Sequence, residues 1–390
     1  MSDALNEQLD GLLAAGVARG AAPGASAIVV DRDGVRWQGA AGERVIGSGV
    51  AMTTDSVGAI FSMTKAVTGA AAMQLVEQGK LDLDAPASEV LPGLADNQVL
   101  EGFDDDGQPI TRPPATPVTL RHLLTHTSGF VYDIWNADAA RWYEVTGTPN
   151  ILSLEKSSLK LPLMFDPGTK WEYGIGIDLA GLMVEEVTGM TLGEYLAEHL
   201  TGPLGMSDTA FVHNPSMLER ACGIHGRGPD GSLAAIGIPP PENPEFEMGG
   251  GGLHGTMGDY GRFMRMILND GEVDGVRVLK PETVQMMADN HIGELRVENL
   301  ATVAPEFSND AEFFPGEPKS WGLTFQINEA PGFTGRPAGT LMWAGLANSF
   351  FWIDRENGIA GAYLSQILPF ADEASTALFF ELEEAVYAAL

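Results

Sequence analysis

The chain has 390 residues, and its 53 acidic against 22 basic side chains give it a formal net charge of −31. So much negative charge argues against nucleic acid or an anionic membrane surface as a partner. The length and a hydrophobic content of 44% predict a globular protein with a large buried core. Cys222 is the single cysteine, which excludes an intrachain disulfide.

The first 20 residues predict a helix rather than an export signal. Acidic residues stand where a signal peptide carries lysines, and the apolar positions from Leu5 to Val17 follow helical spacing. The sequence contains no run of about 18 apolar residues, the length needed to span a bilayer. We therefore expect a cytoplasmic protein with no membrane partner.

Strands follow this first helix. Residues 25–31 and 35–40, joined at Arg32-Asp-Gly34, predict a β-hairpin. A second helix is predicted from Ser62 to Gly79, where glycine supplies a left-handed stop. Because this helix is apolar on nearly every side, we expect it to be central and buried.

Ser62 and Lys65 are three residues apart and so share one face of the first turn of that helix. The positive end of the helix dipole and the unpaired N–H groups there favour a developing serine alkoxide. The same dipole and burial disfavour an ammonium group, which lowers the pKa of the lysine. A neutral lysine beside a serine is a nucleophile with its base. The alternative is a structural lysine that is hydrogen-bonded to carbonyl groups at the boundary between two domains.

The middle of the chain is mainly helical. We expect an exposed acidic loop at 101–117 and a proline-rich crossing at 239–244. The helices predicted after the second one lie at 120–129, 151–161, 177–188, 192–200, 259–269 and 281–289.

Strand patterns return near the C-terminus, at 321–327, 340–343, 348–354 and 358–364, before a last helix at 371–390. Strands at both ends and helices between them predict an α/β fold with an inserted helical domain. The α/β domain is expected to be discontinuous, from 1–80 and 250–390, with an antiparallel sheet flanked by helices. The all-α domain would span 81–249, with the active site at the interface of the two domains.

Ser-x-x-Lys is a weak pattern by itself, because it occurs three times. Ser153 with Lys156 and Ser157 with Lys160 match as well, but they lie in a polar segment and are expected to be solvated. The pair of Ser62 and Lys65 differs because the helix around it is apolar. A lysine is rarely buried among apolar residues unless it has a specific structural or catalytic role.

Two further motifs contain residues that could take part in catalysis, but neither motif is specific by itself. Tyr173 follows a Pro-Gly turn at a helix entry, where a phenol could shuttle a proton; a core or hinge tyrosine is an equally good interpretation. Trp343-Ala-Gly345 lies in a predicted strand, where a glycine lets substrate approach an edge N–H that could form half an oxyanion hole.

Metal and nucleotide sites are disfavoured. His122 and His126 have the i, i+4 spacing of a metal pair but lack the glutamate between them, and the acidic run at 104–106 lacks the last ligand of a calcium loop. No Gly-x-Ser-x-Gly, P-loop or Gly-x-Gly-x-x-Gly motif occurs. We expect no metal and no cofactor.

Several motifs in one order carry a family resemblance. These are Ser62-x-x-Lys65, Leu123-Leu-Thr-His-Thr-Ser-Gly129, Pro167-Gly-Thr-Lys-Trp-Glu-Tyr173, Pro203-Leu-Gly-Met206, Gly250-Gly-Gly-Leu253 and Trp343-Ala-Gly345. From about residue 20 to the C-terminus, the chain resembles the serine β-lactamase-like family, in its class C-like carboxylesterase branch (family VIII esterases). The resemblance implies a β-lactamase/transpeptidase-like fold.

The resemblance also implies roles. Ser62 would be the nucleophile, with Lys65 and Tyr173 as base and proton shuttle. The backbone N–H groups of Ser62 and Leu346 would form the oxyanion hole beside Trp343 and Gly345. Further candidates for the substrate pocket are Phe130, Tyr132, Trp135, Trp142 and Ile175.

Two departures from the family pattern point to the substrate. Ile175 stands where lactam- and peptide-handling members have the asparagine of Tyr-x-Asn, and Trp343 replaces the cation of Lys-Thr-Gly or His-x-Gly. Both changes favour a neutral, apolar ester of small to medium size over a lactam or peptide. We therefore predict a serine carboxylesterase that acts through an acyl-enzyme on Ser62. A β-lactamase or D-amino-acid peptidase, an acyltransferase and a non-catalytic penicillin sensor remain as alternatives.

Overall fold

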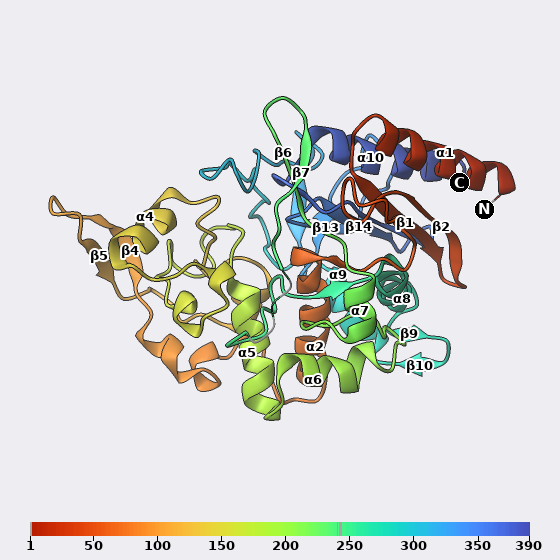
Figure 1. The fold of residues 1–390 in the computed structure, drawn as a ribbon. Helices are drawn as coiled ribbons and strands as arrows, with labels where there is room; N and C mark the ends of the chain where they lie inside the picture. Colours follow the sequence, from red (N-terminus) through yellow and green to blue (C-terminus); the bar gives the residue numbers. More distant parts are fainter. Residues whose placement is uncertain (1, 240, 242–243) are drawn as a thin grey trace.

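A seven-stranded antiparallel sheet, in the order β11-β12-β13-β14-β15-β1-β2, organises the computed structural model (Figure 1). The structure describes residues 2–239, 241 and 244–390, so the proline-rich crossing predicted at 239–244 lies partly outside the described residues. The strands are β11 (Lys319–Trp321), β12 (Gln326–Asn328), β13 (Leu341–Gly345), β14 (Ser349–Asp354), β15 (Ile359–Leu364), β1 (Gly24–Asp31) and β2 (Val35–Gly42).

The two ends of the chain meet in this sheet. β1, from the N-terminal part, pairs with β15 from the C-terminal part, over Ser26 to Asp31. β13, β14 and β15 are buried at every position, because both faces of the sheet are covered. The edge strand β2 is partly exposed. The prediction of an antiparallel sheet flanked by helices is therefore confirmed.

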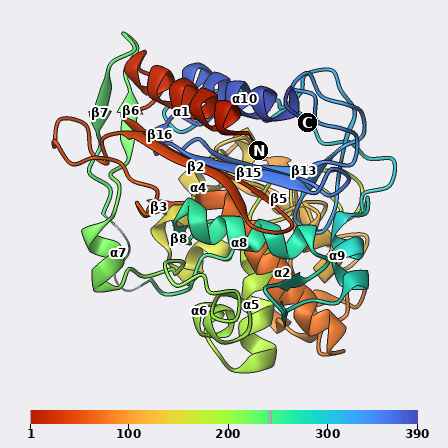
Figure 2. The ribbon, with the colours of Figure 1, turned by 90° about the vertical axis from the view of Figure 1, so that its right-hand side faces the viewer.

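Helices cover both faces of the sheet. α1 (Asp3–Ala18) and α10 (Glu373–Tyr387) lie side by side on one face, and α8 (Met257–Leu268) lies on the other (Figure 2). Beyond α8 lies α2 (Thr64–Glu77), whose residues from Thr64 to Leu75 are all buried. The predicted central, buried helix is confirmed, and it packs against α5 (Gly176–Thr188).

Shorter elements complete the fold. The remaining helices are α3 (Leu120–Leu124), α4 (Ala137–Thr146), α6 (Leu192–Leu196), α7 (Pro215–Glu219) and α9 (Pro281–Ala288). The remaining strands are β3 (Gly58–Ala59), β4 (Val99–Phe103), β5 (Pro109–Arg112), β6 (His225–Arg227), β7 (Leu233–Ala235), β8 (His254–Gly255), β9 (Glu272–Val273), β10 (Val276–Arg277) and β16 (Ile367–Leu368).

Four local predictions were wrong. The helix predicted at 120–129 ends at Leu124, and His126 shortly after it has a φ of 57°. The strand predicted at 321–327 is a hairpin of β11 and β12, since the chain reverses near Thr324 at a φ of 82°. The loop predicted at 101–117 contains the β4–β5 hairpin. The helix predicted at 151–161 is two short 3₁₀ turns, because Leu154 adopts a left-handed conformation between them. In the strand at 321–327 and the helix at 151–161, one residue with a positive φ breaks a hydrophobic pattern that looks continuous.

The proposed division into domains rests on the same arrangement. The sheet comes from residues 24–42 and 319–364, while α3 to α6 lie in the interval 81–249. β6, inside that interval, pairs with β16 near the C-terminus, so the two parts are joined by strand pairing as well as by packing. The boundaries at 80 and 249 stay a prediction. In the part of the chain that the structure describes, no helix has both the length and the apolarity to cross a bilayer.

Candidate active site

Ser62 lies in a single 3₁₀ turn, Phe61–Met63, that leads directly into α2. Phe61, just before it, has a φ of 43°, a conformation that costs a residue with a side chain about 1–3 kcal/mol. The turn is held in place by the N–H of Ile60, which donates to the carbonyl of Leu253 at 3.0 Å. Ser62 is half-buried just before the helix, whereas the residues of α2 from Thr64 to Leu75 are buried.

Lys65 is completely buried, and three oxygens surround its amine. Its Nζ lies 3.2 Å from Ser62 Oγ, 2.9 Å from the hydroxyl of Tyr132 and 2.6 Å from the carbonyl of Gly250. Burial lowers the pKa of Lys65 to about 7, against the opposing charge of Asp178. A substantial fraction of the lysine is therefore neutral at neutral pH and able to accept the serine proton.

Tyr173 completes the cluster from the loop before α5. Its ring centroid lies 4.7 Å from Lys65 Nζ, and its hydroxyl accepts a hydrogen bond from Trp343 Nε1 at 3.0 Å. Burial raises the pKa of Tyr173 above its usual range, and hydrogen bonds with Ser62 and Trp343 act in the opposite direction. Tyr173 is thus a protonated phenol beside the amine of Lys65, where a proton shuttle between the lysine and a leaving group would stand.

The Trp343-Ala-Gly345 motif lies at the end of β13, against the turn that carries Ser62. A Cβ on Gly345 would stand 2.3 Å from the carbonyl oxygen of Ile60, so only glycine permits this close approach. Leu346 and Phe61 pack on the same small apolar cluster. Leu346, the predicted donor of the second oxyanion N–H, is therefore beside the serine turn.

Aromatic side chains form one wall of the site. The ring of Tyr132 lies 5.2 Å from that of Tyr173, and the ring of Trp135 lies 5.5 Å from it. Trp135 Nε1 donates to Ser308 Oγ at 3.0 Å. The sequence placed Tyr132 only in this wall, whereas the structure also bonds it to the amine of Lys65.

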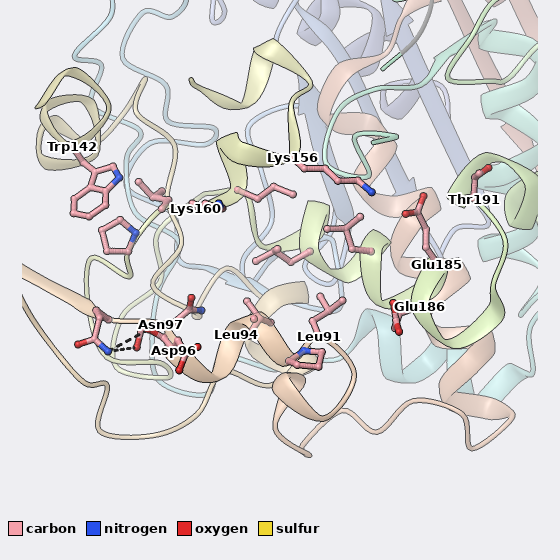
Figure 3. Close-up of a pocket in the computed structure, with 18 of the residues that line it drawn as sticks. Leu91, Leu94, Asp96, Asn97, Trp142, Lys156, Lys160, Glu185, Glu186 and Thr191 are labelled. Carbon is pink, nitrogen blue, oxygen red and sulfur yellow. Dashed lines mark hydrogen bonds between the residues drawn. The ribbon is translucent and has the colours of Figure 1, made fainter. Parts of the chain in front are cut away.

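The other predicted pocket residues are Phe130, Ile175 and Trp142. Phe130 and Ile175 are fully buried in the main core. Trp142, on α4, lines a separate cavity of about 870 Å³ whose lining contains none of Ser62, Lys65 and Tyr173 (Figure 3). The structure does not bring Trp142 together with the nucleophile.

The two competing Ser-x-x-Lys pairs differ sharply from Ser62 and Lys65. Ser153, Lys156 and Lys160 are exposed, and Ser157 is half-buried. The side chains of Lys156 and Lys160 both line the cavity of Trp142 (Figure 3). The prediction that these residues are solvated is confirmed.

The two histidines serve local structure. The N–H of Thr119 donates to His122 Nδ1 at 3.3 Å, which closes the capping box of α3. The ring of His126 packs against Trp171, Tyr173 and Trp321, and burial together with the charge of Lys65 keeps the pKa of this imidazole well below its usual range. Among the described residues, no group of three or more His, Cys, Asp or Glu side chains could hold a metal.

Sequence reasoning missed Asp178. It lies in the first turn of α5, is completely buried, and accepts from the N–H of Gly250 at 2.7 Å through Oδ1. The available signal was a carboxylate five residues after Tyr173 in an otherwise apolar helix start, Gly176-Ile-Asp-Leu-Ala180.

A Ser-x-x-Lys pair at the head of a buried helix, between an antiparallel sheet and a helical region, defines a serine enzyme of hydrolysis or acyl transfer with a β-lactamase/transpeptidase-like fold. Comparison with known proteins agrees. The model of the family described as Beta-lactamase matches residues 9–385, and the chain belongs to this family.

The proteins similar to this chain include an esterase and several acyltransferases. The chain is 36% identical to the lovastatin esterase of Penicillium rubens, over 85% of each chain. It is 34% identical to the monacolin J acid methylbutanoyltransferase of Aspergillus terreus, over 84% of this chain and 81% of that one. The unliganded structure of simvastatin synthase from Aspergillus terreus superposes with a TM-score of 0.86 at 28% identity, covering 100% of this chain and 99% of that one.

Proposed function

We propose that this protein is a serine carboxylesterase that hydrolyses small to medium neutral carboxylic esters through an acyl-enzyme on Ser62. The observation that carries the proposal is the 3.2 Å contact between Ser62 Oγ and the amine of Lys65, a buried lysine whose pKa lies at about 7. Of the three Ser-x-x-Lys pairs in the chain, this is the one whose lysine is equipped to act as a base.

The steps of the reaction follow from this geometry. Neutral Lys65 takes the proton of Ser62 Oγ as the oxygen attacks the ester carbonyl. The N–H groups of Ser62 and Leu346 would bind the oxyanion, and the hydroxyl of Tyr173 would pass a proton to the departing alkoxide. Water then attacks the acyl-enzyme as Tyr173 takes back a proton from it. Lys65 returns its proton to Ser62 Oγ, which releases the acid and restores Ser62.

The substrate class rests on the two departures from the family pattern. Ile175 offers no amide to a lactam or peptide, and its side chain is buried. The Nε1–H of Trp343 is already donated to Tyr173, and this residue carries no charge for a substrate carboxylate. A neutral ester needs neither group. The absence of an amide at Ile175 and of a charge at Trp343 supports membership of the family VIII branch.

We also propose a cytoplasmic location. A chain with a single cysteine needs no intrachain disulfide, and disulfides are rare in the reducing cytoplasm.

The direct test removes the nucleophile and compares it with a matched serine. Ser62→Ala should abolish hydrolysis of p-nitrophenyl butyrate, whereas Ser153→Ala, in the exposed Ser-x-x-Lys pair, should leave it unchanged. Mass spectrometry after treatment with a fluorophosphonate should map the adduct to Ser62. Retained turnover in Ser62→Ala, or an adduct at another residue, would refute the proposal.

A lactam substrate is tested separately. Turnover of nitrocefin should be much slower than turnover of the butyrate ester, because Ile175 and Trp343 provide no lactam-binding groups. A strong preference for nitrocefin would show that the enzyme handles lactams by contacts other than the two that we considered.

Acyl transfer is a second candidate function, favoured by the relatives. Two of the three proteins compared above are named for acyl transfer or synthesis rather than hydrolysis. An acyl-enzyme on Ser62 would serve either reaction, since an alcohol can replace water in the second step. Adding an alcohol acceptor to the butyrate assay and measuring the transester product against free acid decides which reaction dominates.

A further inference from the structure

A glycine-rich segment, Gly249–Leu253, holds the start of α2 by three hydrogen bonds. The carbonyl of Gly249 accepts from Thr68 Oγ1 at 2.8 Å, the carbonyl of Gly250 accepts from Lys65 at 2.6 Å, and the N–H of Leu253 donates to Thr64 Oγ1 at 3.1 Å. The position of the lysine amine therefore depends on where this segment lies.

Asp178 ties the same segment to α5. Its Oδ1 accepts from the N–H of Gly250 at 2.7 Å, and a Cβ on Gly250 would stand 2.4 Å from its Oδ2. The carboxylate thus lies directly against the glycine whose carbonyl holds Lys65. Only a residue without a side chain allows that contact.

The second oxygen of Asp178 is buried and has no hydrogen-bond partner among the described residues. An unsatisfied buried carboxylate oxygen is costly, so its presence needs a compensating interaction. The charge that opposes it is that of Lys65, which lies across Gly250 and makes no direct ion pair with it. This arrangement differs from a salt bridge, which would hold the lysine permanently protonated.

We infer that Asp178 is a positioning residue of the catalytic centre: it places the carbonyl of Gly250 against Lys65 and, by its negative charge, sets the pH at which that lysine can act as a base. The inference rests on the proposed function. Asp178 itself touches neither the serine nor the space in front of it.

The other titratable groups around the pair are neutral at working pH. Tyr132, Tyr143 and Tyr173 are phenols whose pKa values burial raises above the usual range, and the charge of Asp178 raises them further. His126, which faces Lys65 from the segment after α3, is uncharged because its pKa is depressed. The glycine-rich segment contributes no ionisable group near the amine. Asp178 is therefore the charged partner to which the pKa of Lys65 responds.

Asp178 and burial act on the pKa of Lys65 in opposite directions. The carboxylate raises the pKa of Lys65 while burial lowers it to a net value of about 7, and burial raises the pKa of Asp178 to about 6. Removing the negative charge leaves burial unopposed, so the pKa of Lys65 falls. The neutral, basic form of the lysine then persists to lower pH.

The experiment measures the rate at which a fluorophosphonate labels Ser62, as a function of pH, in the full-length protein. Asp178→Asn should move the acidic limb of this profile to lower pH by at least one unit. The matched control is Glu185→Gln, a half-buried carboxylate two turns further along α5 whose Oε1 accepts from Leu192 N–H. Its limb should stay within 0.2 units of the wild type.

A merely structural role gives a different result. If Asp178 acted only by holding Gly250, Asp178→Asn, which keeps an acceptor for the N–H of Gly250, would leave the limb unmoved, with labelling either unchanged or slowed by one factor at every pH, and that result would overturn the inference. Asp178→Ser, which is smaller and keeps an acceptor for the N–H of Gly250, provides a second uncharged variant should the amide fold poorly. Failure of both variants to fold would assign Asp178 to stability and also overturn it. If the wild type is not labelled at Ser62 at all, the proposed function fails instead.

Discussion

Lys65 and Arg336 are both completely buried cationic side chains, but the groups that contact them differ in charge. Arg336, between β12 and β13, makes a two-pronged ion pair with Glu383 of α10, and its guanidinium also lies 4.4 Å from the ring centroid of Phe314. Lys65 is held by a serine, a phenol and a carbonyl, none of them charged.

The difference separates a structural charge from a reactive one. A guanidinium does not lose its proton, and a buried partner of opposite charge holds it in one geometry. An amine among neutral oxygens has no such contact partner, so burial outweighs the more distant charge of Asp178 and lowers its pKa to about 7. The variants below test whether the contacts, rather than burial as such, decide which cation takes part in chemistry.

The largest expected effect comes from replacing Lys65 with a cation that cannot act as a base. Lys65→Arg should lower kcat/KM for p-nitrophenyl butyrate by about 10²- to 10⁴-fold, because loss of a general base has this size and arginine stays protonated. Lys65→Met should lose a similar amount. Activity of Lys65→Arg within tenfold of the wild type would mean that positive charge, and not basicity, is what the site uses.

Glu383→Gln breaks the structural pair instead. Removing one partner of a buried ion pair leaves the other charge unpaired, which should lower the free energy of unfolding by about 3–5 kcal/mol. Denaturant titration measures the loss. The control is Glu381→Gln on the same helix, whose exposed pair with Arg19 should be worth about 1 kcal/mol or less.

Activity supplies the other half of this test. Folded Glu383→Gln should keep the acidic limb of its pH–rate profile, since Arg336 pairs with α10, which covers the opposite face of the sheet from α8. A shift of that limb would show that Arg336 and Lys65 are electrostatically coupled, and that their structural and chemical roles are not separate.

The pH dependence of the wild type is the next effect in size. Because Lys65 acts as a base only when neutral, kcat/KM should rise with pH through about 7 and level off above it. At pH 6 we expect about one tenth of the plateau value, which follows from a single ionisation one unit below its pKa. A flat profile between pH 5.5 and 8 would mean that the serine is activated by another group.

The smallest effect concerns Trp343. Trp343→Phe keeps an aromatic ring but removes the N–H that donates to Tyr173, so turnover should fall by about two- to tenfold, as for one neutral hydrogen bond. Trp135→Phe is the control, because its N–H donates to Ser308 and not to Tyr173. Equal losses in both variants would point to packing of the aromatic wall rather than to the tyrosine hydrogen bond.

The sequence by itself determined the strongest periodic elements. The all-round apolar character of 62–79 predicted a buried helix, and the strand patterns at both ends predicted one sheet, since burial of whole faces leaves a clear signal in composition. Turns at Leu154 and Thr324 escaped prediction because a single left-handed residue interrupts an element without changing its hydrophobic pattern.

The apolar helix around them singled out Ser62 and Lys65 among three Ser-x-x-Lys pairs, and the ordered motifs added Tyr173. Only the tertiary structure decided which oxygens surround the buried lysine and that Trp142 lines a different cavity. It also brought Gly250 and Asp178 to Lys65 from 185 and 113 residues away along the chain. A pKa depends on burial and on charges near in space, and neither quantity exists until distant segments have packed together.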